Sequence, residues 1–176
     1  SNEKWDRIVI EKEAAAKDIY FDGVEVGELV VESGNSAKVQ LWDVDAEQVT
    51  VKEPELDKLT LKDLATLLAD EKTRDKAIER YLAVSAKNES AKATAPTIVT
   101  MEDAKVEKMV ARANASLDLA AGEVGVVALE ASSAVERANV VLKNYDGELI
   151  YKGTEGKSNT QLKAVNSNIS KLVVEE

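Results

Sequence analysis

A regular ten-residue repeat of apolar residues is the feature that most restricts how this chain can fold. Two apolar residues with one residue between them recur every ten positions, in the pairs Leu29/Val31, Val39/Leu41, Val49/Val51 and Leu59/Leu61. Side chains two positions apart lie on the same face of a β-strand, whereas a helix turns them to different sides. The repeat therefore predicts short strands at a constant spacing.

The same pattern returns in the second half of the chain with variable spacing. The pairs there are Met109/Ala111, Leu117/Leu119, Val127/Leu129, Val140/Leu142, Leu149/Tyr151, Leu162/Ala164 and Leu172/Val174. Glycines such as Gly122, Gly125 and Gly153 lie between them, where they favour turns. This half is predicted to be strands joined by short turns.

Two mainly β folds carry short strands at such a spacing, the parallel β-solenoid and the antiparallel β-sandwich. A sandwich needs no fixed step, because its loops vary in length, whereas each coil of a solenoid stacks on the one before it. We predict one domain over residues 1–176, a parallel β-solenoid with a strand spacing of about ten residues. The irregular second half leaves the antiparallel β-sandwich as the alternative.

Two segments depart from the strand pattern. Residues 62–95 are predicted to be an inserted α-helical segment with its linker, because apolar residues fall there at helical spacing, namely Leu64, Leu67, Leu68, Ala77, Ile78, Tyr81 and Leu82. The polar stretch from Ser85 to Pro96 is assigned to the linker, and the helix is expected to shield a flank or an end of the strands. Residues 1–18 are predicted to form an N-terminal cap that contains a short helix.

Composition excludes several classes of function. The chain has no cysteine and no histidine, which removes disulfides, thiolate chemistry and the commonest general base. Its 33 acidic and 23 basic residues give a net charge of −10, which argues against a nucleic-acid partner. The apolar runs are strand-sized, so no membrane insertion of this segment is expected. We predict that the chain is not an enzyme.

Five residues are candidates for ligand contact. Asp43 and Asp45 alternate around a valine, so their carboxylates are candidates to hold a calcium ion together with Asp22 or Glu47. The competing explanation is a solvated turn. Trp42 follows an inward-facing leucine and is expected to face outward, either against a sugar ring or under the inserted helix.

Tyr145 and Tyr151 lie near the glycine-rich C-terminal part of the chain. They are candidates for a small ligand-contacting patch. The competing explanation is that both rings pack at a corner of the fold. No cofactor other than the candidate calcium ion is predicted.

Three segments, Gly23–Val31, Val39–Val44 and Gln48–Val51, resemble the β-solenoid modules of large bacterial cell-surface proteins, and later segments follow the same alternation of strand and small turn. The likeness covers residues 20–62 and 97–176. It implies an extracellular, non-catalytic module at the cell surface, acting as a structural spacer or an adhesion surface that contacts a glycan or an envelope protein. A carbohydrate-active β-helix enzyme and a surface-layer or filament subunit are the alternatives, and no catalytic residue of such enzymes can be placed on this chain.

Overall fold

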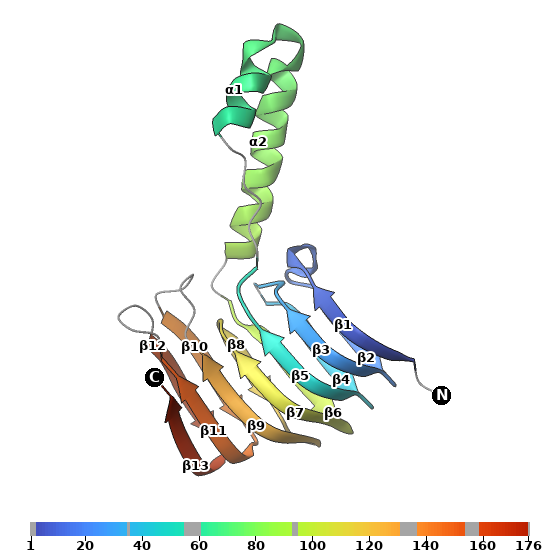
Figure 1. The fold of residues 1–176 in the computed structure, drawn as a ribbon, viewed down its shortest axis with the longest axis vertical. Coiled ribbons are helices and arrows are strands. Elements are labelled where there is room, and N and C mark those ends of the chain that lie inside the picture. Colours follow the sequence, from blue (N-terminus) through green and yellow to red (C-terminus); the bar gives the residue numbers. More distant parts are fainter. Residues whose placement is uncertain are drawn as a thin grey trace.

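The chain is mainly β, with its strands in two sheets (Figure 1). The computed structural model describes residues 3–34, 36–54, 61–92, 95–130, 137–153 and 159–175. The seven-stranded sheet contains β1 (Lys4–Ile10), β3 (Glu25–Val31), β5 (Asp45–Val51), β7 (Ala104–Ala111), β9 (Gly122–Glu130), β11 (Asp146–Lys152) and β13 (Asn168–Glu175). The six-stranded sheet contains β2 (Asp18–Asp22), β4 (Lys38–Trp42), β6 (Thr97–Glu102), β8 (Ala115–Asp118), β10 (Arg137–Lys143) and β12 (Asn159–Val165).

Each sheet takes every second strand of the chain, in chain order. All strand pairs that the described residues form are parallel. A sandwich built from hairpins would pair consecutive strands in opposite directions, so the antiparallel alternative has no support. The expectation of a mainly β chain with parallel strands is confirmed.

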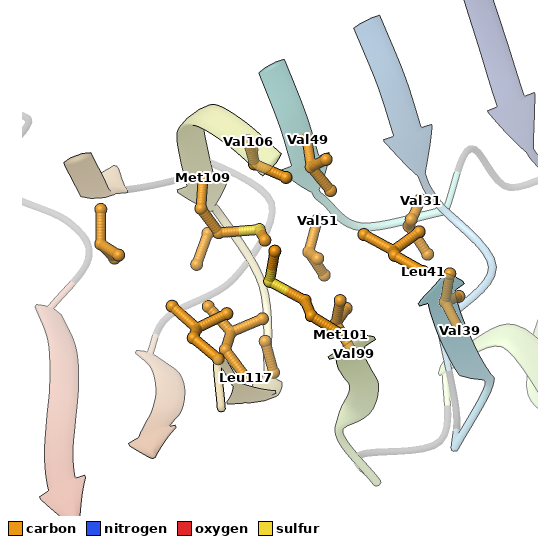
Figure 2. Packing of buried hydrophobic residues seen from close by; sticks show 14 of the residues in the cluster. Val31, Val39, Leu41, Val49, Val51, Val99, Met101, Val106, Met109 and Leu117 are labelled. Atoms are coloured by element: carbon orange, nitrogen blue, oxygen red, sulfur yellow. The ribbon is translucent and has the colours of Figure 1, made fainter. Parts of the chain in front are cut away.

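The hydrophobic core lies between the two sheets and is built from rows of similar side chains. Leu29, Val49, Met109 and Val127 are neighbours in register across four strands, and each is at most 1% exposed. Figure 2 shows side chains of both sheets meeting in this core, with Leu41 and Leu117 contributed by the six-stranded sheet. Burial of each such side chain stabilises the fold by roughly 1.5–3 kcal/mol. Three of the four apolar pairs of the ten-residue repeat, Leu29/Val31, Val39/Leu41 and Val49/Val51, are core residues.

A left-handed residue marks every described turn from the six-stranded sheet to the seven-stranded sheet. These residues have φ between 47° and 68°, and they are Gly23, Asp43, Asp103, Ala121, Asn144 and Asn166. Glycine, aspartate and asparagine tolerate this conformation best, which explains why they occupy five of the six positions. Backbone hydrogen bonds also link the turns to adjacent strands. For example, the Asp43 N–H, in the turn after β4, donates to the Glu102 carbonyl at the end of β6 at 3.0 Å.

The N-terminal segment combines an edge strand with a short helix. Residues 4–10 form the edge strand β1, and only Lys12–Ala14 are helical, as the short 3-10 helix η1. Ile8 and Ile10 lie in register beside Leu29 and Val31. The segment is a strand because it extends the same apolar rows as its neighbour.

The inserted segment forms two helices, α1 (Leu61–Ala69) and α2 (Glu71–Lys92). The residues from Ser85 to Lys92 therefore belong to a helix and not to a linker, as their alanine, lysine and glutamate content favours. Leu61 begins α1 and is not in a strand, while Leu59 lies outside the described residues.

The helices extend away from the two sheets and do not shield them as expected (Figure 1). They emerge where β5 leads toward β6. Apolar side chains on α2 remain open to solvent, with Ile78 51%, Tyr81 52% and Leu82 60% exposed. The helical spacing of these residues indicated the helix correctly, but not what covers its apolar side.

Candidate functional site

Two exposed aromatic rings form a pair on the outer face of the six-stranded sheet. Trp42 at the end of β4 is 41% exposed, and Tyr20 on the neighbouring strand β2 is 58% exposed. Their ring centroids lie 5.8 Å apart with an interplanar angle of 71°, an edge-to-face contact. Alternation along β4 turns Val39 and Leu41 into the core, so Trp42 points outward as expected.

The inserted helices do not cover Trp42. This residue lies at the carboxyl end of β4, where the chain turns toward β5. The helices instead join the carboxyl end of β5 to the start of β6, and β6 begins beside Lys38 at the other end of β4. Trp42 and the insert therefore lie at opposite ends of the strands, and the ring stays open to solvent.

Polar side chains surround the aromatic pair in register. Trp42 lies between Asp22 and Glu102 on the two neighbouring strands, and Gln40 lies between Tyr20 and Thr100. A ring face can pack against the C–H groups of a sugar, while carboxylate, amide and hydroxyl groups can bond to its hydroxyls. The surface combines both kinds of group within three adjacent strands.

Asp43 and Asp45 lie on either side of the buried Val44 at the neighbouring turn. Asp43 adopts the left-handed turn conformation with φ 47°, and its carboxylate lies beside Gly23, 3.9 Å from where a Cβ on that glycine would be. Asp45 begins β5 between Glu25 and Lys105. Within the described ranges, no three acidic residues are grouped closely enough to hold a metal ion. The calcium hypothesis therefore gains no third ligand.

Tyr145 and Tyr151 do not form the surface patch considered for them. Tyr145 is 3% exposed, and its hydroxyl donates to the Glu148 carbonyl at 2.6 Å. Burial raises the pKa of this hydroxyl above its ordinary value of 10.0. Tyr151 is partly buried against the core. Tyr145 lies at the turn between β10 and β11, where a Cβ at Gly147 would be 2.6 Å from its hydroxyl oxygen, whereas Tyr151 lies within strand β11.

Tyr20 is the site residue that the sequence analysis missed. The register of β2 against β4 advances by twenty residues, so that Asp22 pairs with Trp42 and Tyr20 with Gln40. Two steps of the ten-residue repeat give the same offset. Counting twenty residues back from Trp42 gives Asp22 as its neighbour, and Tyr20, two residues before Asp22, faces the same side of the strand. The sequence therefore contained enough information to predict that Tyr20 lies near Trp42.

One further carboxylate has a shifted pKa. Burial raises the pKa of Glu53, just after β5, above its ordinary value of 4.5. The folded chain therefore binds the Glu53 proton more tightly than the unfolded chain does. The contribution of this proton to the free energy of unfolding is fully present below about pH 4.5 and is lost as the pH rises through the folded pKa. We expect Glu53→Gln to raise the melting temperature at about pH 7.5 and to have little effect at about pH 3.5.

The measurement is thermal unfolding followed by circular dichroism at both pH values. Glu79→Gln, at an exposed position on α2, is the matched control and should leave the melting temperature unchanged at both. An equal gain from Glu53→Gln at both pH values would show that burial of its charge is not the cause.

Nothing in the comparisons assigns the chain to a known group. No family model, no curated protein and no solved structure matches it. No helix in the described ranges is both long enough and apolar enough to cross a membrane. The function is therefore argued from the arrangement of the strands and from the aromatic pair.

Proposed function

We propose that this chain is a β-solenoid module of a bacterial cell-surface protein, in which it acts as a non-catalytic spacer with a glycan-contacting face. The observation that carries the proposal is the in-register stacking of parallel strands from alternating sheets. Where no segment is inserted, neighbouring layers are offset by about twenty residues, as between Leu29 and Val49. One strand from each sheet then makes one coil.

The stacking supports a mechanical role. Each layer contacts only the layers beside it, so length is added without changing the rest of the structure. The rows of apolar side chains and the backbone bonds between parallel strands both run along the stack. These apolar rows and backbone hydrogen bonds resist bending and extension of the stack, as a spacer requires. The net charge of −10 favours solubility and repels anionic surfaces.

Single-molecule stretching tests the spacer role. A solenoid that opens coil by coil should release about twenty residues at a time, or roughly 7 nm of extended chain. We expect repeated steps of this size between handles attached at the two ends of the chain. One abrupt opening of all the strands, with no steps of this size, would contradict coil-by-coil behaviour.

The Tyr20–Trp42 pair supports the contact with glycans. Exposed rings flanked by Asp22 and Glu102 present an apolar face with hydrogen-bond acceptors at its edge. Binding to an array of bacterial surface glycans tests this role. We expect Trp42→Ala to weaken binding at least about tenfold, equivalent to about 1.4 kcal/mol.

Trp5→Ala is the matched control, because Trp5 on β1 is also exposed, at 51%. It should leave glycan binding unchanged. If no glycan binds, or if both variants bind as the unchanged chain does, the aromatic pair is not a glycan site. The spacer role is then still decided by the stretching measurement alone.

A further inference from the structure

The aromatic pair of Tyr20 and Trp42 lies among carboxylates. Asp22 and Glu102 lie in register on either side of Trp42, and Asp43 follows it directly in the chain. All three acidic residues are exposed. Because hydrogen-bonded strands lie about 4.8 Å apart, the carboxylates on both neighbouring strands are within reach of a ligand that rests on the indole ring. The charge of such a ligand is therefore restricted by these three residues.

These three carboxylates have no ion-pair partner in the part of the chain that the structure describes. On the seven-stranded sheet, acidic residues do pair with basic residues of the adjacent strand, as Glu32 does with Lys52 at 3.1 Å and Glu28 with Arg7 at 3.8 Å. The one basic residue of β4 is Lys38, at the other end of the strand. The surface around the aromatic pair is thus locally negative and favours a cationic ligand.

The carboxylates are spread out and do not converge on one point. Asp22 and Glu102 lie on opposite sides of β4, so two strand spacings, or about 10 Å, separate their positions. Among the residues that the structure describes, no three acidic side chains are close enough together to hold a metal ion. The arrangement suits an extended ligand that carries more than one positive charge.

The two exposed rings provide a second, independent reason to expect a cation. An ammonium group is attracted to the face of an aromatic ring when it lies within about 6 Å of the ring centroid, and tryptophan is the strongest such partner. Tyr20 and Trp42 meet edge to face with an interplanar angle of 71°, so two ring faces of different direction are close together. The uncharged amide of an N-acetylated sugar lacks this attraction.

The neighbouring polar side chains favour a sugar over a simple amine. Gln40 lies in register between Tyr20 and Thr100, one outward position away from Trp42. Amide and hydroxyl groups both donate and accept hydrogen bonds, as sugar hydroxyls require. A lysine side chain has no hydroxyl group to use them.

We propose that the face around the aromatic pair binds a glycan whose sugars carry free, protonated amino groups. Asp22, Asp43 and Glu102 select these sugars over their N-acetylated forms. One sugar ring rests on Trp42, and the ammonium groups lie beside the carboxylates. This inference rests on the proposed glycan contact and names the class of sugar that the contact recognises.

Two probes that differ only in their acetyl groups test the proposal by titration calorimetry against the full chain. They are the β-1,4-linked tetramers of glucosamine and of N-acetylglucosamine. We expect the glucosamine tetramer to bind at least about tenfold more tightly. The preference should shrink as salt is added, because the carboxylates are exposed and their charges are screened. Equal binding of the two tetramers, or tighter binding of the acetylated one, would overturn the proposal.

A double variant separates the carboxylates from the rings. Asp22→Asn combined with Glu102→Gln should weaken binding of the glucosamine tetramer at least about tenfold and leave the acetylated tetramer unaffected. Trp42→Ala should weaken binding of both tetramers. Asp18→Asn combined with Glu79→Gln is the matched control, because it removes two exposed charges distant from Trp42. An equal loss in the control would assign the preference to net charge alone and overturn the proposal.

Two further outcomes distinguish this inference from the glycan contact on which it rests. If glycans on the array bind through Trp42 but the glucosamine tetramer does not bind, the choice of sugar is wrong and the glycan contact stands. If neither tetramer nor any glycan on the array binds, both are overturned. Tetralysine that binds as tightly as the glucosamine tetramer would indicate a general cation site and would also overturn the proposal. Circular dichroism should show that every variant is folded.

Discussion

Gly125→Ala is expected to destabilise the fold severely, by about 3 kcal/mol or more. A Cβ at Gly125 would lie 2.5 Å from the carbonyl oxygen of Glu107 on the adjacent strand β7. That oxygen belongs to backbone, so the contact can be relieved only by moving β7 or β9. Because both strands are held in register by their neighbours, such a shift disturbs the whole stack. Urea unfolding measures the free energy lost.

Gly153→Ala is the matched control. There the added Cβ would meet the Tyr151 ring at 3.8 Å, an ordinary van der Waals distance. Its free energy of unfolding should lie within about 0.5 kcal/mol of that of the unchanged chain. Similar losses in the two variants would point to the flexibility of glycine, and not to close approach of the strands, as the reason for Gly125.

Leu117→Ala is expected to cost about 2–5 kcal/mol of unfolding free energy. Leu117 is fully buried on β8 of the six-stranded sheet, where Figure 2 shows its side chain in the core cluster. Its removal leaves a cavity between two sheets whose strands are fixed by parallel pairing, so the surroundings relax little. Urea unfolding again provides the measurement.

Leu82→Ala compares the same substitution at an exposed site. Leu82 on the protruding helix α2 is 60% exposed, and its loss should change the unfolding free energy by less than about 0.5 kcal/mol. A loss below about 1 kcal/mol for Leu117→Ala would mean that the apolar rows do not form a tightly packed core.

The core could be predicted from the sequence because its pattern is local. Parallel strands in register place residues of the same kind side by side, so a two-residue spacing repeated along the chain is sufficient to identify Val49 and Val51 as core residues. The same spacing at Leu172 and Val174 gives exposed residues. They lie on β13, an edge strand of the seven-stranded sheet, and a local pattern does not report the position of a strand within its sheet.

The candidate site was predicted in part for the same reason. Alternation within β4 was enough to point Trp42 outward, but its contact with Tyr20 depends on the register between strands. Tyr145 was considered for the surface and is buried, because a turn residue does not follow strand alternation. For the helices, amphipathic spacing indicated Ile78 and Leu82 as one apolar side without showing that it stays exposed.

The connections between the sheets differ sharply in length on the two sides of the stack. Turns that leave the six-stranded sheet have one to three residues, whereas connections that leave the seven-stranded sheet have from three to forty-five, the longest holding α1 and α2. Lengthening a connection that leaves the seven-stranded sheet does not alter the short turns on the other side or their left-handed residues. A foreign domain or epitope grafted into these longer connections should therefore be displayed without disturbing the stack, which makes the chain a natural scaffold for presentation.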